Sequence, residues 1–216
     1  MEFRVDPWAT VLALVGGCAW LVSSYSLVRV GEQLALVVLL NAVALAVLGR
    51  DGYRLVRYPM LLLFCAVPIG TELVPILMEA TAIGSGMLLT LFRVAYYQDG
   101  MLFQLAGGHF EIVTYCSGLR YLFASLVFSL AVAYECFQDV RLRVFYVAVV
   151  VVLAIALNSV RAATVMGVAS WSEMRWLAGE DHIYFGWVLF CLAFIGFAQL
   201  GGLLAHWFQD SELRVS

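Results

Sequence analysis

The sequence predicts an all-α polytopic membrane protein, a bundle of about six transmembrane helices with an interfacial helix and a short outer β-hairpin. Composition is the first observation: 64% of the 216 residues are hydrophobic, 12% are charged, and the mean hydropathy is +0.96. A soluble domain of this size needs a wet exterior and does not carry this much apolar surface. The second observation is that apolar runs of spanning length alternate with short polar turns. The formal net charge of −3 argues against a nucleic-acid partner.

Six apolar runs have the length that a spanning helix needs. They cover residues 8–28, 33–49, 59–78, 117–137, 144–160 and 183–207. No internal repeat or linker separates them, so residues 1–216 are expected to form a single membrane domain. Pro68 and Pro75 are expected to bend the third run or to end it early.

Arginines gather in two of the polar turns and predict the orientation of the chain. Three lie within residues 50–57, and Arg141 and Arg143 lie in the turn between the fourth and fifth runs. Loops rich in arginine tend to stay in the cytoplasm. Both turns and both termini are therefore predicted to be on the cytoplasmic side of a bacterial inner membrane.

Two placements are open for residues 79–98, which are apolar but carry several polar side chains. If the segment spans the membrane, Cys116 becomes cytoplasmic and Arg141 and Arg143 face outward. If it lies in the interface as an amphipathic helix, both arginines face inward, and we favour this placement. Residues 162–181, which contain two tryptophans, also suit an interfacial helix.

Two short β-prone runs flank Gly107 and Gly108 within residues 99–114, which predicts a hairpin. In the second strand, His109 and Glu111 share one face, and Phe110 and the following isoleucine share the other. This hairpin is expected to cap the outer surface just before Cys116.

Among the five cysteines, Cys116 stands apart because it lies in a polar, glycine-containing stretch, Thr114-Tyr-Cys-Ser-Gly-Leu-Arg120. Three of the others lie inside apolar runs and the fourth near the end of one, where a cysteine is usually a small hydrophobe. No pair has the C-x-x-C spacing of a thioredoxin-like redox site.

The order of the spans predicts that Cys116, Arg161 and His182 meet at one membrane surface. Cys116 opens the fourth run, Arg161 closes the fifth, and His182 opens the sixth. An even number of crossings returns the chain to the same face, whichever way the protein is oriented. The residues 144–161 cover about 27 Å as a helix, which is about one hydrocarbon thickness.

These three residue types suit acyl transfer through a thioester. Cys116 is expected at a helix N-terminus, where unpaired N–H groups and the helix dipole stabilise a thiolate and Gly118 gives close backbone access. His182 is suited to take the thiol proton and later protonate a leaving amine. Backbone N–H groups and the Arg161 guanidinium are suited to hold a developing oxyanion.

Each residue alone has a plainer interpretation, so the prediction depends on their joint placement. A lone cysteine is usually unreactive, and an arginine at the end of a span usually snorkels to the interface. Asn158 either caps backbone or pairs with a neighbouring helix, and Arg120 either binds lipid phosphate or a substrate carboxylate or is a surface charge. Glu180 and Asp181 are expected to be solvated rather than to orient His182.

No cofactor or metal is required by this chemistry. A zinc site made of Cys116, His109 and His182 is a metal alternative. His109 otherwise is expected to be an exposed strand residue.

The chain resembles the exosortase/archaeosortase family of membrane transpeptidase-like cysteine enzymes, over about residues 60–205. The resemblance rests on three elements in the family's order, Cys116-Ser-Gly-Leu-Arg120, Asn158-Ser-Val-Arg161 and His182-Ile-Tyr-Phe-Gly-Trp187. It implies that Cys116 is the nucleophile, Arg161 the stabiliser of the transition state and His182 the general acid and base. The motifs also make Asn158, Ser117, Gly118 and Arg120 supporting candidates.

The resemblance further implies a substrate: an exported protein with a C-terminal sorting signal made of a short motif, a transmembrane helix and a basic tail. Family members cleave near the motif, are thought to transfer the protein to an acceptor, act on the outer side of the membrane and often accompany exopolysaccharide production. This chain has fewer N-terminal spans than many members and Tyr115 where a small residue is common. Its substrate motif, its acceptor and its subfamily are left open.

Two other functions fit a small apolar bundle with short loops. One is a non-catalytic membrane component of a surface-polysaccharide or secretion assembly. The other is a lipid-binding protein or a small-solute transporter, with Asn158 and Arg161 lining its path. The first predicts that Cys116 is dispensable, and the second predicts solute flux that survives thiol alkylation.

Overall fold

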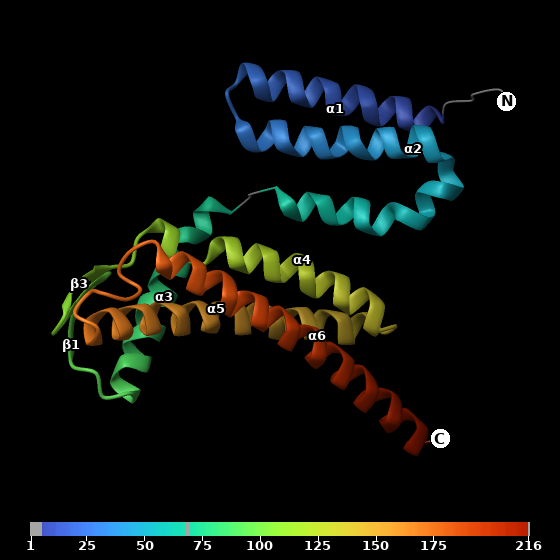
Figure 1. Ribbon diagram of the computed structural model, residues 1–216. Coiled ribbons are helices and arrows are strands. Elements are labelled where there is room, and N and C mark those ends of the chain that lie inside the picture. Colours follow the sequence, from blue (N-terminus) through green and yellow to red (C-terminus); the bar gives the residue numbers. More distant parts are fainter. Residues whose placement is uncertain (1–5, 68–69, 216) are drawn as a thin grey trace. The chain divides into compact units, whose positions relative to one another are not determined.

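A computed structural model describes residues 6–67 and 70–215, and helices dominate it (Figure 1). The chain forms two compact units, Met1–Ile69 and Gly70–Ser216. The expectation of a single domain stays a prediction. Both units are built mainly from helices, and the second one also contains a small sheet.

The first unit is a pair of antiparallel helices, α1 (Pro7–Tyr25) and α2 (Arg29–Leu62). Asp6 caps α1 by accepting a hydrogen bond from the Trp8 N–H at 2.9 Å, and its carboxylate also pairs with Arg50 Nε at 2.6 Å. The backbone of Gly49 leaves the helical region, with φ 67° and ψ 178°, and breaks α2 into two sections. The run predicted to end at residue 49 therefore ends at a real break in the helix.

The span predicted at 59–78 is wrong. The second section of α2 ends at Leu62, a 3₁₀ turn follows at Leu63–Ala66, and a second one at Thr71–Leu73 leads into α3 (Val74–Leu91). Pro75 lies in the first turn of α3, where its missing N–H is tolerated, so it starts a helix rather than bending one. Pro68 lies outside the described residues.

Three long helices, α4 (Leu119–Cys136), α5 (Val140–Trp171) and α6 (Asp181–Val215), run side by side in alternating directions (Figure 1). Buried small residues recur every four positions along α4, which lets neighbouring helices approach closely in a membrane: Ser125, Ser129 and Ala133. Tyr146 of α5 is fully buried and donates a hydrogen bond to the Phe197 carbonyl of α6 at 2.6 Å. These contacts form an apolar core at the end of the bundle where α5 begins.

Helix α5 is longer than the predicted span 144–160, and the separate interfacial helix predicted at 162–181 is wrong. It continues ten residues past Arg161 to Trp171, and turns occupy residues 172–180. At about 1.5 Å per residue it is about 48 Å long, more than the hydrocarbon thickness of about 30 Å. The helix continues because Ala163, Met166 and Ala169 bury one face of its last three turns.

The predicted hairpin is confirmed. The strands β2 (Leu102–Leu105) and β3 (Gly108–Glu111) pair antiparallel, and β1 (Tyr96–Asp99) adds a third strand to the sheet, in the order β1-β2-β3. In β3 the alternation is as predicted, because His109 and Glu111 are exposed while Phe110 and Ile112 face the protein interior. The helical segment predicted at 79–98 therefore ends early, at Leu91.

The sheet lies at the end of the bundle where α5 ends and α6 begins (Figure 1). Its buried side packs on α3 and on the last turns of α5 through one apolar cluster, made of Ala82, Leu89, Phe103, Leu105, Ile112, Ala163 and Met166. Helix α5 thus carries one core near each of its ends. The polar segment Asn158–Arg161 lies between them.

Within residues 6–67 and 70–215, six helical segments are long and apolar enough to cross a membrane. They are Pro7–Tyr25, Arg29–Cys65, Thr71–Leu91, Thr114–Cys136, Val140–Trp171 and Asp181–Phe208. Their number agrees with the prediction, although Thr71–Leu91 covers parts of both the predicted span 59–78 and the segment 79–98, whose placement was left open. In Figure 1, α3 runs across the direction of α4, α5 and α6 rather than along it, which supports the interfacial placement favoured for this region.

Candidate active site

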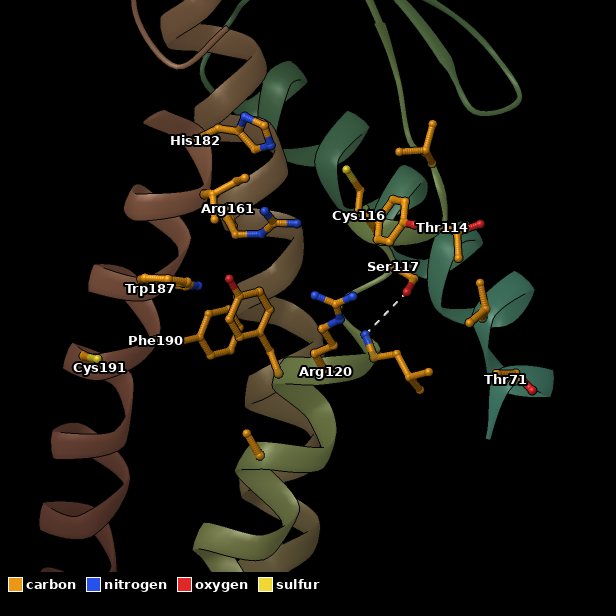
Figure 2. Close-up of a pocket in the computed structure, with 18 of the residues that line it drawn as sticks. Thr71, Thr114, Cys116, Ser117, Arg120, Arg161, His182, Trp187, Phe190 and Cys191 are labelled. Atoms are coloured by element: carbon orange, nitrogen blue, oxygen red, sulfur yellow. Dashed lines mark hydrogen bonds between the residues drawn. The ribbon is translucent and has the colours of Figure 1, made fainter. Parts of the chain in front are cut away.

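A cavity of about 780 Å³ opens in the second unit, among the start of α3, the stretch before α4, the middle of α5 and the start of α6 (Figure 2). Its polar lining includes the three residues that the sequence predicts to converge, Cys116, Arg161 and His182. Figure 2 shows their side chains reaching toward the same space from three different elements. The remaining polar lining includes Thr114, Ser117 and Arg120, and the apolar side includes Trp187, Phe190 and Phe194.

The cavity also bears on the placement of α3. Thr71, just before α3, and Cys116, after the sheet, both line it. A full crossing by α3 would carry the chain to the other membrane surface, and the sheet that follows Leu91 provides no second crossing. The shared cavity therefore favours an interfacial α3.

Cys116 is the last residue of a 3₁₀ turn, Thr114–Cys116, and is partly buried. Its backbone N–H donates to the Val113 carbonyl at 2.7 Å. The prediction that it lies at a helix N-terminus needs correction, because α4 begins three residues later, at Leu119. The nucleophile candidate is therefore held by a turn of its own, just ahead of α4.

Gly118 is required by two features of this turn. Its φ of 79° lies in the left-handed region, where side chains other than hydrogen are strained. A Cβ at this position would lie 2.5 Å from Cγ of Asn158, so α5 leaves no room for one. The close backbone approach predicted for Gly118 is thus made to Asn158.

Arg161 is buried, with 6% of its surface exposed, yet its charged end borders the cavity. Its Nε donates to Asn158 Oδ1 at 3.2 Å, and its guanidinium carbon lies 5.6 Å from the centre of the Tyr121 ring. That ring stacks on Phe190 with centroids 3.8 Å apart. Among the described residues, no carboxylate pairs with Arg161. Its terminal N–H groups are therefore left to act on a ligand in the cavity (Figure 2).

His182 lies in the first turn of α6 and is partly buried. Its Nδ1 contacts the Gly179 carbonyl, which only accepts hydrogen bonds, so Nδ1 carries a proton; in the neutral imidazole Nε2 is then the nitrogen with the lone pair. The Asp181 carboxylate accepts hydrogen bonds from the N–H groups of Leu177 and Gly179. Asp181 therefore orders the loop before α6 instead of being simply solvated, and it does not contact the imidazole.

The supporting candidates occupy different parts of the cavity. Ser117 is buried, and its hydroxyl accepts a hydrogen bond from the Leu119 N–H at 3.4 Å. Arg120 is exposed, and its guanidinium carbon lies 5.7 Å from the Tyr115 ring. His109 lies on the exposed face of the sheet and not in the lining of the cavity, so the zinc alternative is not supported.

Sequence reasoning missed the residues that fix Arg161 from neighbouring helices. Tyr121 directly follows the Cys116–Arg120 motif and Phe190 lies three residues after the His182–Trp187 motif, so a helical-face argument extended beyond each motif would have found both. Thr81 does not line the cavity. It accepts a hydrogen bond from Asn158, and no local sequence pattern marks it.

The amino-acid sequence matches the family model for transmembrane exosortases over residues 1–198. The chain belongs to the transmembrane exosortase family. The match includes the two N-terminal helices, which lie outside the region on which the resemblance rested. Comparisons with curated proteins and with solved structures gave no match. As an exosortase with six span-capable helical segments, the protein is a multi-pass membrane protein.

Proposed function

We propose that this exosortase is a cysteine-dependent membrane endopeptidase or transpeptidase that acts through a thioester on Cys116. One observation carries the proposal: the thiol of Cys116, the terminal N–H groups of Arg161 and the imidazole of His182 line one cavity. A nucleophile, a base and a cation for a developing oxyanion are the parts that acyl transfer requires.

In the first step, His182 Nε2 takes the thiol proton while Cys116 Sγ attacks the carbonyl carbon of the scissile peptide bond. The carbonyl oxygen gains the negative charge. The terminal N–H groups of Arg161 donate to it, together with N–H groups in the first turn of α4 that have no partner within the helix. Because Nε and one face of the guanidinium are already engaged, little reorganisation accompanies the step.

In the second step, the carbonyl re-forms, the C–N bond breaks, and His182 returns its proton to the leaving amine. This releases the C-terminal anchor and leaves the protein as a thioester on Cys116. An amine or hydroxyl of an acceptor, or water, then attacks the thioester and gives its proton to His182. The C–S bond breaks, and the departing thiolate takes that proton back.

The substrate we propose is an exported protein whose C-terminal signal contains a short motif, a transmembrane helix and a basic tail. The apolar wall of the cavity, with Trp187, Phe190 and Phe194, suits a chain that emerges from lipid. Arg143 lies about 27 Å along α5 from Arg161, which is about one hydrocarbon thickness. With Arg143 in the cytoplasm, the cavity opens on the outer side of the inner membrane.

The experiment that tests this function follows an exported reporter carrying such a signal in cells that make Cys116→Ala. We expect unprocessed reporter to accumulate, as it does without the exosortase. Cys136→Ala is the matched control, because this thiol ends α4 at the opposite end from Cys116 and belongs to the apolar core. Normal processing by Cys116→Ala would exclude the proposed enzyme and favour a non-catalytic membrane component.

A further inference from the structure

A buried amide joins the nucleophile turn to the arginine. Asn158 of α5 has 2% of its surface exposed, and its Nδ2 donates to the Cys116 carbonyl and to Thr81 Oγ1, each at 2.9 Å. Its Oδ1 accepts from Arg161 Nε at 3.2 Å. One side chain thus makes hydrogen bonds to α3, to the turn that carries the thiol and to the cation of the candidate site.

The hydroxyl of Thr81 determines which way this amide faces. The hydroxyl donates its hydrogen to the Leu77 carbonyl at 2.7 Å, so toward Asn158 it acts only as an acceptor. A hydroxyl that only accepts selects the amide nitrogen as its partner. The amide oxygen must then face the other way, toward Arg161. Thr81 is 1% exposed, so water does not compete for this arrangement.

We infer that Asn158 is a positioning residue that sets the placement of Cys116 relative to Arg161, and that Thr81 is the residue that orients it. The inference rests on the proposed function and deepens it. Both N–H groups and the oxygen of the Asn158 amide are engaged, and Gly118 packs directly against it, so the amide has no alternative position. A shift of about 1 Å between reacting groups lowers a rate by about 100-fold.

The same pair of helices provides a matched control. Ser85 lies one turn along α3 from Thr81, is fully buried, and donates to the Ser159 carbonyl of α5 at 3.3 Å. This hydrogen bond also crosses from α3 to α5, but it touches neither Cys116 nor Arg161. Loss of the Ser85 bond tests helix packing alone, whereas loss of the Thr81 bond tests packing and amide orientation together.

The test uses the purified full-length protein in detergent and, as substrate, a peptide with the C-terminal motif and anchor helix of the exported reporter that the cells process. The variants are Asn158→Ala, Thr81→Val, Thr81→Ser and Ser85→Ala, with Cys116→Ala in the same assay. The readouts are kcat and KM, the rate at which iodoacetamide alkylates Cys116 as followed by peptide mass spectrometry, and thermal unfolding.

We expect Asn158→Ala to lower kcat by about 100-fold with little change in KM, and to change the rate of Cys116 alkylation. Thr81→Val is expected to lower kcat by about 10-fold, since it leaves an amide hydrogen without its partner. Thr81→Ser keeps the hydroxyl and is expected to restore kcat. Ser85→Ala is expected to change thermal unfolding more than kcat.

Three outcomes overturn the inference: a wild-type kcat for folded Asn158→Ala, equal losses for Thr81→Ser and Thr81→Val, or a loss for Ser85→Ala as large as that for Thr81→Val. If Asn158→Ala does not fold, the two Thr81 variants and Ser85→Ala decide the matter. If Cys116→Ala is inactive but Asn158→Ala is active, this inference is wrong and the proposed function stands. If Cys116→Ala is active, the proposed function is wrong.

Discussion

Two arginines of α5 are held in the same way but face different surroundings: Arg143 in the first turn of the helix, and Arg161 ten residues before its end. Each lies over a tyrosine of α4, with its guanidinium carbon 5.2 Å from the Tyr134 ring in one case and 5.6 Å from the Tyr121 ring in the other. Each also uses Nε to donate a hydrogen bond to an oxygen. The two sites therefore share their anchoring chemistry.

They differ in what Nε contacts and in what the rest of the guanidinium is left to do. Arg143 donates to the Phe137 carbonyl at 2.7 Å and so closes the turn between α4 and α5. Arg161 donates to the side chain of Asn158, which also holds the Cys116 carbonyl, and its free end borders the cavity. The anchoring contacts alone therefore do not indicate function. A candidate catalytic arginine differs from a structural one because its terminal N–H groups have no protein partner and face a cavity.

Replacing each arginine by lysine should give the largest contrast. Lysine keeps the charge, but its compact ammonium group lacks the planar fork with which Arg161 contacts Asn158 through Nε and leaves its terminal N–H groups at the cavity. We expect Arg161→Lys to lower kcat by about 1,000-fold, the upper range for loss of an oxyanion donor. Arg143→Lys should leave kcat close to wild type and lower thermal stability slightly. Similar kcat values for the two variants would remove the distinction drawn here.

A methyl group at Gly118 should have the next largest effect, because it acts on Arg161 through Asn158. Gly118→Ala adds about 1–2 kcal/mol of left-handed backbone strain and displaces the Asn158 amide. We expect kcat to fall by about 100-fold, measured on protein that still unfolds cooperatively. Gly167→Ala is the control, since nothing lies within 4 Å of its added Cβ and alanine favours a helix. Equal losses would show that the Asn158 contact is unimportant.

The smallest contrast concerns the tyrosines under the two guanidinium groups. Cation–π contacts contribute about 0.5–2 kcal/mol, so Tyr121→Leu should lower kcat by about 10-fold by loosening Arg161. Tyr134→Leu should affect unfolding temperature but not kcat. Steady-state kinetics beside thermal unfolding of both variants checks this. A drop in kcat for Tyr134→Leu as large as that for Tyr121→Leu would contradict it.

Features set by local sequence or by the number of crossings were predictable. The hairpin around Gly107 follows from β-prone runs beside two glycines, and the break at Gly49 from the end of an apolar run. The convergence of Cys116, Arg161 and His182 follows from an even number of crossings, which does not depend on helix boundaries.

Features set by distant contacts were not predictable. Arg161 was expected to end a helix, because a buried arginine and an interfacial arginine look alike in sequence. Its burial depends on contact with Tyr121, which lies forty positions earlier. Thr81 meets Asn158 only because α3 crosses α5, and the two lie 77 positions apart. Pro75 was read as a helix breaker, whereas its position in a first turn depends on where the preceding helix stops.

The measurement that tests the central claim most directly is mass spectrometry of the purified exosortase, quenched in acid during turnover of an anchor-containing peptide. The thioester mechanism predicts an acyl adduct on the peptide that contains Cys116, with the mass of the N-terminal cleavage product and removable by hydroxylamine. Arg161→Lys should form it slowly and Arg143→Lys at the normal rate. Cleavage that continues with no adduct on Cys116, and that persists in Cys116→Ala, would contradict the claim.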